Sequence, residues 1–503
     1  MEPELFWLIL RRFAGKKRSA LLKLFALVVV FILIGEVSLS ASGTSASTNT
    51  PIKHIIILIM ENHSFDNFFG QYGRASSGVI ASGITIPYNL ITHPVSQNLT
   101  AVSPDNFSTT DPYEGYSNYH QDWNNGQMNG FLNGSGPSSL YYFTADQMGL
   151  QWALAQNYAI GDMYFSSTLS ETLPNRLISL AGYSPVKQDQ FSPPPSIPYD
   201  KTIFSELNTY GVSWGYYFKN PSNGIYPLNF ISGMNSRTSN IGKWTDLENE
   251  IRSGTIPDVT WVSSISGGES GYSQHPPDNV LVGEIWMFTI IEMLMESSLW
   301  KSSAIFVTYD EGGGYYDQVS PPSVGGSQLG FRVPFMVISP YAKEDYVSNT
   351  IMSHTSILGF IDYNWKMLPL NRLVSFSNLP LDMFNFNSTN PDGSKIRSPL
   401  VFNASFQRFA MQSIDFNQSF VEQFHDIGNL FPMYFQYNVS ALNYTLQGSS
   451  NFNLSQVTHS LYVAGNQTTS FPFNTIIYEA ALVSIFIGIV IFITIRLRKS
   501  KER

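Results

Sequence analysis

The chain has 503 residues, of which 43% are hydrophobic, so it can bury a large core and is not a disordered protein. It contains no cysteine, which excludes a disulfide scaffold and thiol chemistry but leaves the compartment open. The formal net charge is −9, and between the two basic tails described below 17 basic and 32 acidic side chains give −15. This acidity argues against nucleic acid as a partner.

The N-terminal end combines positive charge with an apolar run. Six Lys and Arg residues lie within the first 23 residues, and they are followed by LFALVVVFILIG and then by small polar residues. We expect residues 1–22 to be a basic cytoplasmic segment and residues 23–43 to be a signal peptide or an uncleaved signal anchor.

A catalytic domain is predicted over residues 50–370, where short β-rich runs alternate with helix-like stretches. This alternation is typical of an α/β fold with a mostly parallel sheet flanked by helices. The clearest strands are residues 54–60, 211–218, 258–264, 304–309 and 332–339, and the clearest helices are residues 144–158, 174–182 and 279–297.

The remainder of the chain predicts an external accessory region and an anchor. Residues 371–475 are rich in Asn and Ser, and their N-x-S/T sequons predict N-linked glycans. Residues 476–495 form an apolar run that is long enough for a transmembrane helix. Residues 496–503 are a basic tail that the positive-inside rule places in the cytoplasm. We therefore expect a cell-membrane protein with an extracytoplasmic catalytic domain.

Two predicted strands end in acidic residues. IIILIM runs into Glu61 and Asn62, and AIFVTY runs into Asp310 and Glu311, which three glycines follow. Ligands of open α/β sheets bind beyond the carboxyl ends of the strands. Oxygen ligands on adjacent strand ends could converge on one divalent cation, and the glycines would let the backbone approach closely. The alternative is that these acids cap helices or are simply solvated.

Three histidines lie in polar loops or at turn-to-helix junctions of the predicted domain: His120, His275 and His354. A lone loop histidine is commonly structural or merely exposed. Three of them in an acidic domain could bind an anion or give a proton to a leaving group. The pattern of residues alone does not identify a nucleophile.

Seven sequence blocks follow one another between residues 54 and 358. They are MENHSFDNFFG, HQDWNNGQMNGF, LQWALAQNYAIGDMYFSSTLSETLPNRL, DVTWV with QHPPDN, VTYDEGGGYYDQVSPP, FRVPFMVISPYA and SHTSIL. In this order the blocks resemble those of the phosphoesterase family of bacterial phospholipases C and acid phosphatases, within the alkaline phosphatase-like superfamily. The resemblance implies an alkaline phosphatase-like fold and hydrolysis of a phosphoester.

The resemblance also implies roles for individual residues. Thr172 matches the nucleophile, which also touches the metal, and one divalent metal ion of unknown identity is implied. The other matched metal ligands are Glu61, Asn62, Asp310 and Glu311, and the matched phosphate-side and acid/base residues are His120, Asp162, His275 and His354. A metal would lower the pKa of a bound hydroxyl, so a weak threonine nucleophile becomes usable and a phosphothreonine intermediate follows.

Two positions depart from the family pattern. The family commonly has GPT where this chain has Ser170, Glu171 and Thr172, which puts a negative charge beside the nucleophile. The family's DHV is Asp317, Gln318 and Val319 here, so one histidine is lost. Neither change removes a proposed ligand, but both affect expectations of substrate preference and pH optimum.

The sequence therefore predicts a membrane-anchored, extracytoplasmic phosphoesterase that acts on a phospholipid or on a soluble monoester. Asn175 and Arg176 either hold phosphate or simply begin a helix. The alternative function is a catalytically inactive, glycosylated surface protein that retains the fold. A sulfatase-like hydrolase is disfavoured because the chain has no Cys and lacks the C/S-x-P-x-R context.

Overall fold

The computed structural model describes residues 47–70, 99–103, 106–144, 147–190, 196–265 and 271–387. All of these except Ser47 belong to a unit that begins at Thr48. The predicted signal peptide or signal anchor, residues 23–43, and the predicted transmembrane helix, residues 476–495, lie outside the described residues, as does most of the predicted accessory region. Within the described ranges, no helix is both long enough and apolar enough to span a bilayer.

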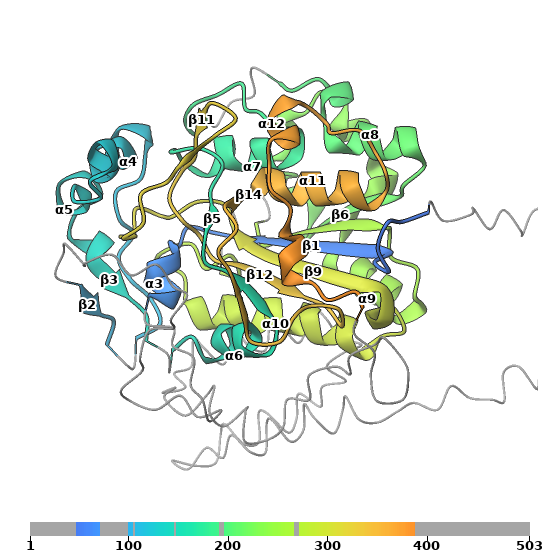
Figure 1. The fold of residues 1–503 in the computed structure, drawn as a ribbon, viewed down its shortest axis with the longest axis horizontal. Coiled ribbons are helices and arrows are strands. Elements are labelled where there is room, and N and C mark those ends of the chain that lie inside the picture. Colours follow the sequence, from blue (N-terminus) through green and yellow to red (C-terminus); the bar gives the residue numbers. More distant parts are fainter. Residues whose placement is uncertain are drawn as a thin grey trace, which may run out of the picture. The chain divides into compact units, whose positions relative to one another are not determined.

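An eight-stranded sheet forms the centre of this unit (Figure 1). All neighbouring strands are parallel except that β12 is antiparallel to both of its neighbours. In sheet order the strands are β13 (Tyr346–Ser348), β4 (Ala159–Gly161), β12 (Phe335–Ile338), β9 (Ser303–Tyr309), β1 (His54–Met60), β8 (Val259–Ser263), β6 (Trp214–Phe218) and β7 (Ile241–Lys243). The predicted mostly parallel α/β sheet is confirmed.

Helices cover both faces of the sheet (Figure 1). One layer contains α7 (Thr172–Ala181), α8 (Ile203–Tyr210), α11 (His354–Asn364) and α12 (Arg372–Ser375). The opposite layer contains α6 (Gly149–Asn157), α9 (Trp244–Ser253) and α10 (Val280–Glu296). With both faces covered, the central strands are buried almost throughout, which explains why they read as continuous apolar runs.

Short elements complete the described part of the chain. Three small helices, α3 (Phe65–Phe69), α4 (Tyr116–Trp123) and α5 (Phe131–Gly134), lie beyond the carboxyl end of β1 (Figure 1). Three two-stranded pairs are β2 (Thr100–Ala101) with β3 (Tyr141–Tyr142), β5 (Tyr164–Phe165) with β14 (Met352–Ser353), and β10 (Ser323–Val324) with β11 (Ser327–Gln328).

Two predicted boundaries shift for identifiable reasons. The strand predicted from residue 211 begins at Trp214, because Gly211 (φ 70°) adopts the left-handed conformation that ends α8. The helix predicted from residue 174 begins at Thr172, so the predicted nucleophile lies in the first turn of α7.

The pairing of β1 with β9 positions the candidate site. Met60 and Tyr309, the last residues of these two parallel strands, are partners in the register. The residues that follow them therefore emerge at the same level of the sheet, at its carboxyl edge, as the strand-end pattern predicts.

Candidate active site

The two predicted acidic strand ends meet at this edge. Glu61 and Asn62 follow β1, Asp310 and Glu311 follow β9, and all four side chains are buried. Asn62 has a left-handed backbone (φ 61°), and its N–H lies 3.4 Å from Asp310 Oδ1. A Cβ on Gly313 would lie 2.0 Å from the carbonyl oxygen of Asn62, so only glycine permits this approach of the two backbones.

Thr172 faces these strand ends from the first turn of α7. Its Oγ1 lies 3.3 Å from Asn62 Oδ1, to which it donates a hydrogen bond. The N–H of Leu173 donates to Asp189 Oδ1 at 2.7 Å. Because a helix N-terminus carries partial positive charge, α7 presents a hydroxyl and a favourable field for an anion at the same point.

Arg176, one turn after Thr172, is a buried counter-ion of the strand-end acids. Its Nε donates to Asp310 Oδ2 at 2.9 Å, and its Nη2 lies 3.5 Å from Glu61 Oε1. The sequence left open whether Arg176 holds phosphate or begins a helix, and the structure places its guanidinium on these carboxylates.

Glu311 has a carboxylate oxygen that no described residue satisfies. Its Oε2 accepts hydrogen bonds from the Tyr119 hydroxyl (2.8 Å) and from the Gly313 N–H (2.6 Å). Its Oε1 is buried and has no hydrogen-bond partner among the described residues. Burial raises the pKa of Glu311 well above its usual range, and the charges of Glu114 and Asp310 raise it further. The orphaned oxygen and the oxygen-rich surroundings fit a hard divalent cation.

Glu114, in the loop before α4, was not predicted to belong to the site. Its Oε1 accepts a hydrogen bond from Asn62 Nδ2 at 2.7 Å, which leaves Asn62 Oδ1 facing Thr172. Burial raises the pKa of Glu114, although the charge of His275 opposes the shift. The only signal in the sequence was an acid six residues before His120, in a loop without periodicity.

His275 is the predicted histidine that lies with Glu61 and Thr172. Its Nδ1 is 2.7 Å from the carbonyl oxygen of Pro276, and its Nε2 is 3.9 Å from Glu114 Oε2. Burial lowers the pKa of His275, but the charges of Glu61 and Glu114 outweigh it and the net shift is upward.

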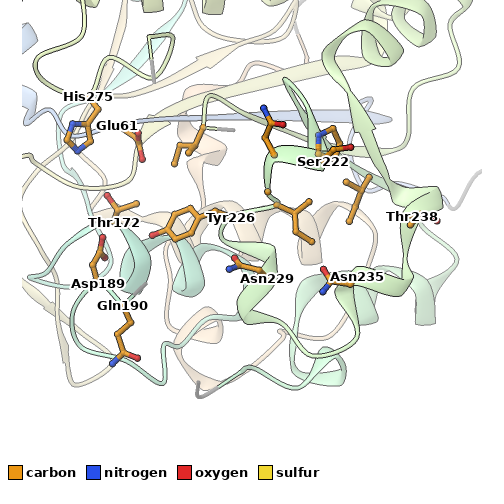
Figure 2. Close-up of a pocket in the computed structure, with 16 residues that line it drawn as sticks. Glu61, Thr172, Asp189, Gln190, Ser222, Tyr226, Asn229, Asn235, Thr238 and His275 are labelled. Carbon is orange, nitrogen blue, oxygen red and sulfur yellow. The ribbon is translucent and has the colours of Figure 1, made fainter. Parts of the chain in front are cut away.

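These three residues line a cavity of about 970 Å³. Figure 2 shows His275, Glu61 and Thr172 near one another. The ring of Tyr226 is directed toward Thr172, and Asp189 lies below Thr172 in this view. Asn229, Asn235 and Thr238 also line the cavity (Figure 2), together with apolar side chains such as Ile225 and Ile241.

Two other predicted histidines have different surroundings. His354 is buried behind the end of β9, with its Nε2 2.8 Å from the carbonyl oxygen of Tyr309 and its Nδ1 3.1 Å from Ser167 Oγ. Burial lowers the pKa of His354 to about 4, so the ring is neutral at pH 7. His120 bonds the carbonyl oxygen of Tyr116 at 2.7 Å and lines a second cavity of about 680 Å³.

Asp162 is part of a buried ion cluster. Arg332 contacts Asp162 Oδ1 at 2.7 Å, Asp66 Oδ1 at 2.7 Å and Asp317 Oδ2 at 3.1 Å. The structure therefore brings together six of the predicted site residues, namely Glu61, Asn62, Thr172, His275, Asp310 and Glu311. It places His120, Asp162 and His354 among other partners, and their roles at the phosphate stay predictions.

The Phosphoesterase family model matches residues 52–368, more than half of the chain, so the chain belongs to this family. Phospholipase C A of Mycobacterium tuberculosis is 28% identical over 427 residues, which cover 68% of this chain and 80% of that protein. Non-hemolytic phospholipase C of Burkholderia pseudomallei is 27% identical and covers 76% of this chain and 65% of that protein. Non-specific phospholipase C4 of Arabidopsis thaliana is 27% identical, and the match covers 59% of this chain and 63% of that protein.

Among solved structures, a protein in the alkaline phosphatase superfamily from Vibrio parahaemolyticus is similar, with 11% identity and a TM-score of 0.33. The match covers 78% of this chain and 93% of that one. The family resemblance seen in the seven sequence blocks is confirmed by the family model. The class of enzyme predicted from it, a phosphoric ester hydrolase, agrees with that family and with relatives named phospholipase C.

Proposed function

We propose that the chain is a cation-dependent phosphoesterase that uses Thr172 as its nucleophile and acts on a phospholipid or a soluble phosphate ester. The observation that carries the proposal is the position of the Thr172 hydroxyl at the N-terminus of α7. There it lies 3.3 Å from Asn62 Oδ1 and shares a cavity with Glu61 and His275. A phosphoryl group in this cavity would meet a hydroxyl, a helix N-terminus and an imidazole on one side.

The residues that would hold the cation are the oxygen-bearing ones at the strand ends. They are Glu61, Asn62, Thr172, Asp310 and Glu311, and the unpartnered Oε1 of Glu311 supports this assignment. When bound there, a divalent cation would lower the pKa of a hydroxyl and neutralise charge on a nonbridging phosphate oxygen. Arg176 holds the carboxyl groups of Glu61 and Asp310 in place through its contacts with both.

The reaction has two steps. Oγ1 of Thr172 bonds to phosphorus as the ester oxygen leaves with a proton, which gives an alcohol and a phosphothreonine. Water then attacks the phosphorus, releases the phosphate product and returns a proton to Thr172. The partial positive charge at the start of α7 stabilises the negative charge of the phosphoryl group in both steps.

The position of the enzyme in the cell is part of the proposal. The apolar segments 23–43 and 476–495, each next to a basic segment, support anchoring in the cell membrane with the catalytic domain outside. Among the described residues, the sequons at Asn106, Asn133 and Asn387 are exposed and are therefore accessible to glycosylation.

A substrate panel tests the activity. We expect the purified full-length protein to hydrolyse an aryl phosphate, an aryl phosphodiester or phosphatidylcholine, and to lose this activity in chelator. Aryl sulfate should remain intact. If none of the phosphoesters is turned over with cations supplied, the alternative of an inactive surface protein replaces the proposal.

Substitution of the nucleophile tests the mechanism. Thr172→Val is nearly isosteric but lacks the oxygen, so we expect turnover to fall by about 10⁴-fold or more with the fold intact. Thr172→Ser should retain part of the activity, and the neighbouring control Thr168→Val should be fully active. Turnover of Thr172→Val within about tenfold of the wild type would instead indicate a water nucleophile.

A further inference from the structure

A second group of cation-binding side chains lies beside the strand-end site. Asp111 and Glu114 come from the loop before α4, and His275 comes from the loop before α10. One ligand atom of each residue lies within 4.8 Å of the ligand atoms of the other two. We propose that Asp111, Glu114 and His275 bind a second divalent cation, adjacent to the cation of the proposed function.

His275 is oriented as a metal-binding histidine would be. Its Nδ1 lies 2.7 Å from the carbonyl oxygen of Pro276, which can only accept, so Nδ1 carries a hydrogen. In the neutral ring the lone pair is then on Nε2, which faces Glu114 Oε2 at 3.9 Å. This separation is too long for a hydrogen bond, but it suits two ligands that each bond one ion at about 2.0–2.2 Å. A backbone carbonyl on the other ring nitrogen is common among metal-ligating histidines.

Glu114 links the two cation sites. Its Oε1 is held by Asn62 Nδ2 at 2.7 Å, which leaves Oε2 directed to His275. The carboxylate is therefore held in place before any ion binds, with Oε1 bonded to Asn62 of the strand-end site and Oε2 facing the second site. The second site also opens to the substrate cavity, because His275 is one of the residues that line it.

Acidic side chains are concentrated around the two sites. Five carboxylates gather here, those of Glu61, Asp111, Glu114, Asp310 and Glu311. Among the described residues, Arg176 is the only Lys or Arg that is ion-paired with any of them. His275 also lies 3.9 Å from Glu114 and can carry a positive charge when it is protonated. The acidic side chains thus outnumber the cationic ones around the two sites.

The donor set indicates the kind of ion. One imidazole nitrogen and two carboxylates favour Zn²⁺ or Mn²⁺ over Ca²⁺ and Mg²⁺, which prefer all-oxygen sites. Three protein ligands leave a coordination position open for water or for a phosphate oxygen. The inference rests on the proposed function in one respect: the second ion would contact the same phosphate ester that Thr172 attacks.

The number of bound ions tests the inference. The full-length protein is freed of metal with chelator, dialysed, and titrated with Zn²⁺ by calorimetry, and bound zinc is measured by elemental analysis. We expect two ions per chain in the wild type and one in Asp111→Asn, whose side chain is exposed and should not disturb folding. Asp310→Asn should lose the strand-end ion, and the exposed-acid control Asp200→Asn should keep both.

His275→Gln provides a second variant, and it should also bind a single ion. A wild type that binds one ion, lost in Asp310→Asn and unaffected by Asp111→Asn, would overturn the second site and leave the proposed function intact. Two ions in both Asp111→Asn and His275→Gln would also overturn it. A wild type that hydrolyses phosphoester without any bound ion would instead contradict the cation role in the proposed function.

Discussion

Arg176 carries the positive charge on which the strand-end acids depend when no cation is bound. Its guanidinium lies 2.9 Å from Asp310 and 3.5 Å from Glu61, and all three side chains are buried. Transfer of an ionised group from water to the protein interior costs roughly several kcal/mol of free energy per ion. This cost is offset only when the buried charges are paired. The proposed cation would therefore act on the same two carboxylates as Arg176.

Replacing Arg176 by Met should leave two buried carboxylates without their partner. We expect the free energy of unfolding, measured by urea titration in chelator, to fall by about 3–5 kcal/mol. The double variant Arg176→Met/Asp310→Asn should recover part of this loss, because one of the stranded charges is gone. A loss of less than about 1 kcal/mol in the single variant would show that the pair contributes little.

Some residues of this site could be predicted from the local sequence pattern, and others could not. Glu61 and Asp310 follow apolar strands, so their place at the carboxyl edge was predictable, whereas Thr172 was identified through the family blocks. Glu114 and Asp111 lie in a loop without periodicity, and nothing local shows that this loop folds over Asn62. Their contribution depends on tertiary contacts, such as the 2.7 Å bond between Asn62 and Glu114.

At the scale of elements, the Arg332 cluster ties together segments far apart in the chain. Asp66 lies in α3, Asp162 follows β4, Asp317 follows β9 and Arg332 precedes β12. One guanidinium serves three buried carboxylates. Burial raises the pKa of Asp317 to about 7, although Arg332 opposes the shift.

Arg332→Met should therefore destabilise the fold. It leaves three buried carboxylates without a counter-ion, and we expect a loss of about 3–5 kcal/mol in the free energy of unfolding. Arg372→Met is a matched control, because Arg372 is exposed in α12 and should cost less than about 0.5 kcal/mol. Equal stabilities of the two variants would contradict a structural role for the cluster.

Helix α10 contributes a buried acid to its packing against α6. Glu284 is fully buried and accepts a hydrogen bond from the N–H of Gln151 at 3.1 Å. Its negative charge contributes to raising the pKa of the Tyr309 hydroxyl. Burial raises the pKa of Glu284 from its ordinary value of 4.5 to about 8. The folded state therefore holds a proton that the unfolded chain releases above pH 4.5, so this residue lowers stability as the pH rises toward 8.

Glu284→Gln removes this pH dependence. We expect the variant to gain stability relative to the wild type as the pH rises from about 4.5 to about 8, by up to about 1.4 kcal/mol per unit. The difference in melting temperature, followed by tryptophan fluorescence at pH 5, 6.5 and 8, measures the gain. A difference that stays constant over this range would mean that Glu284 is ionised in the folded protein.

Among the elements, the sequence predicted the apolar central strands and the helices α6, α7 and α10, but it did not predict α9 or α11. β1, β8, β9 and β12 appeared as apolar runs because helices bury both faces of the sheet. β4 and β13 have three residues each, too few for a pattern, and their pairing depends on contacts across the sheet. The sequence placed His354 near the phosphate, and only the tertiary structure shows that its Nε2 contacts the carbonyl oxygen of Tyr309 at the end of β9; its role at the phosphate stays a prediction.

At the scale of the whole molecule, the ligands and the nucleophile of the proposed site precede the predicted accessory region and anchor. The ligands of both proposed cations and the nucleophile lie between residues 61 and 311, the family match ends at residue 368, and the described residues end at 387. The later residues hold the proposed glycosylated accessory region and the proposed anchor. Chemistry and attachment to the membrane are thus expected to be separable.

A shortened chain tests this separation. We expect residues 48–387 to fold and to hydrolyse a soluble aryl phosphate with a kcat within a few fold of the full-length protein, because every proposed site residue and the whole central sheet are retained. The full-length protein should sediment with membranes after cell lysis, and the shortened chain should not. Thr172→Val in the shortened chain should be inactive, which would confirm that the measured turnover comes from this site.

Two outcomes would contradict the separation. If circular dichroism shows that the shortened chain folds, but it lacks the activity of the full-length protein, residues outside 48–387 contribute to the site. If both chains sediment with membranes equally, the proposed anchor segments are not what holds the protein there.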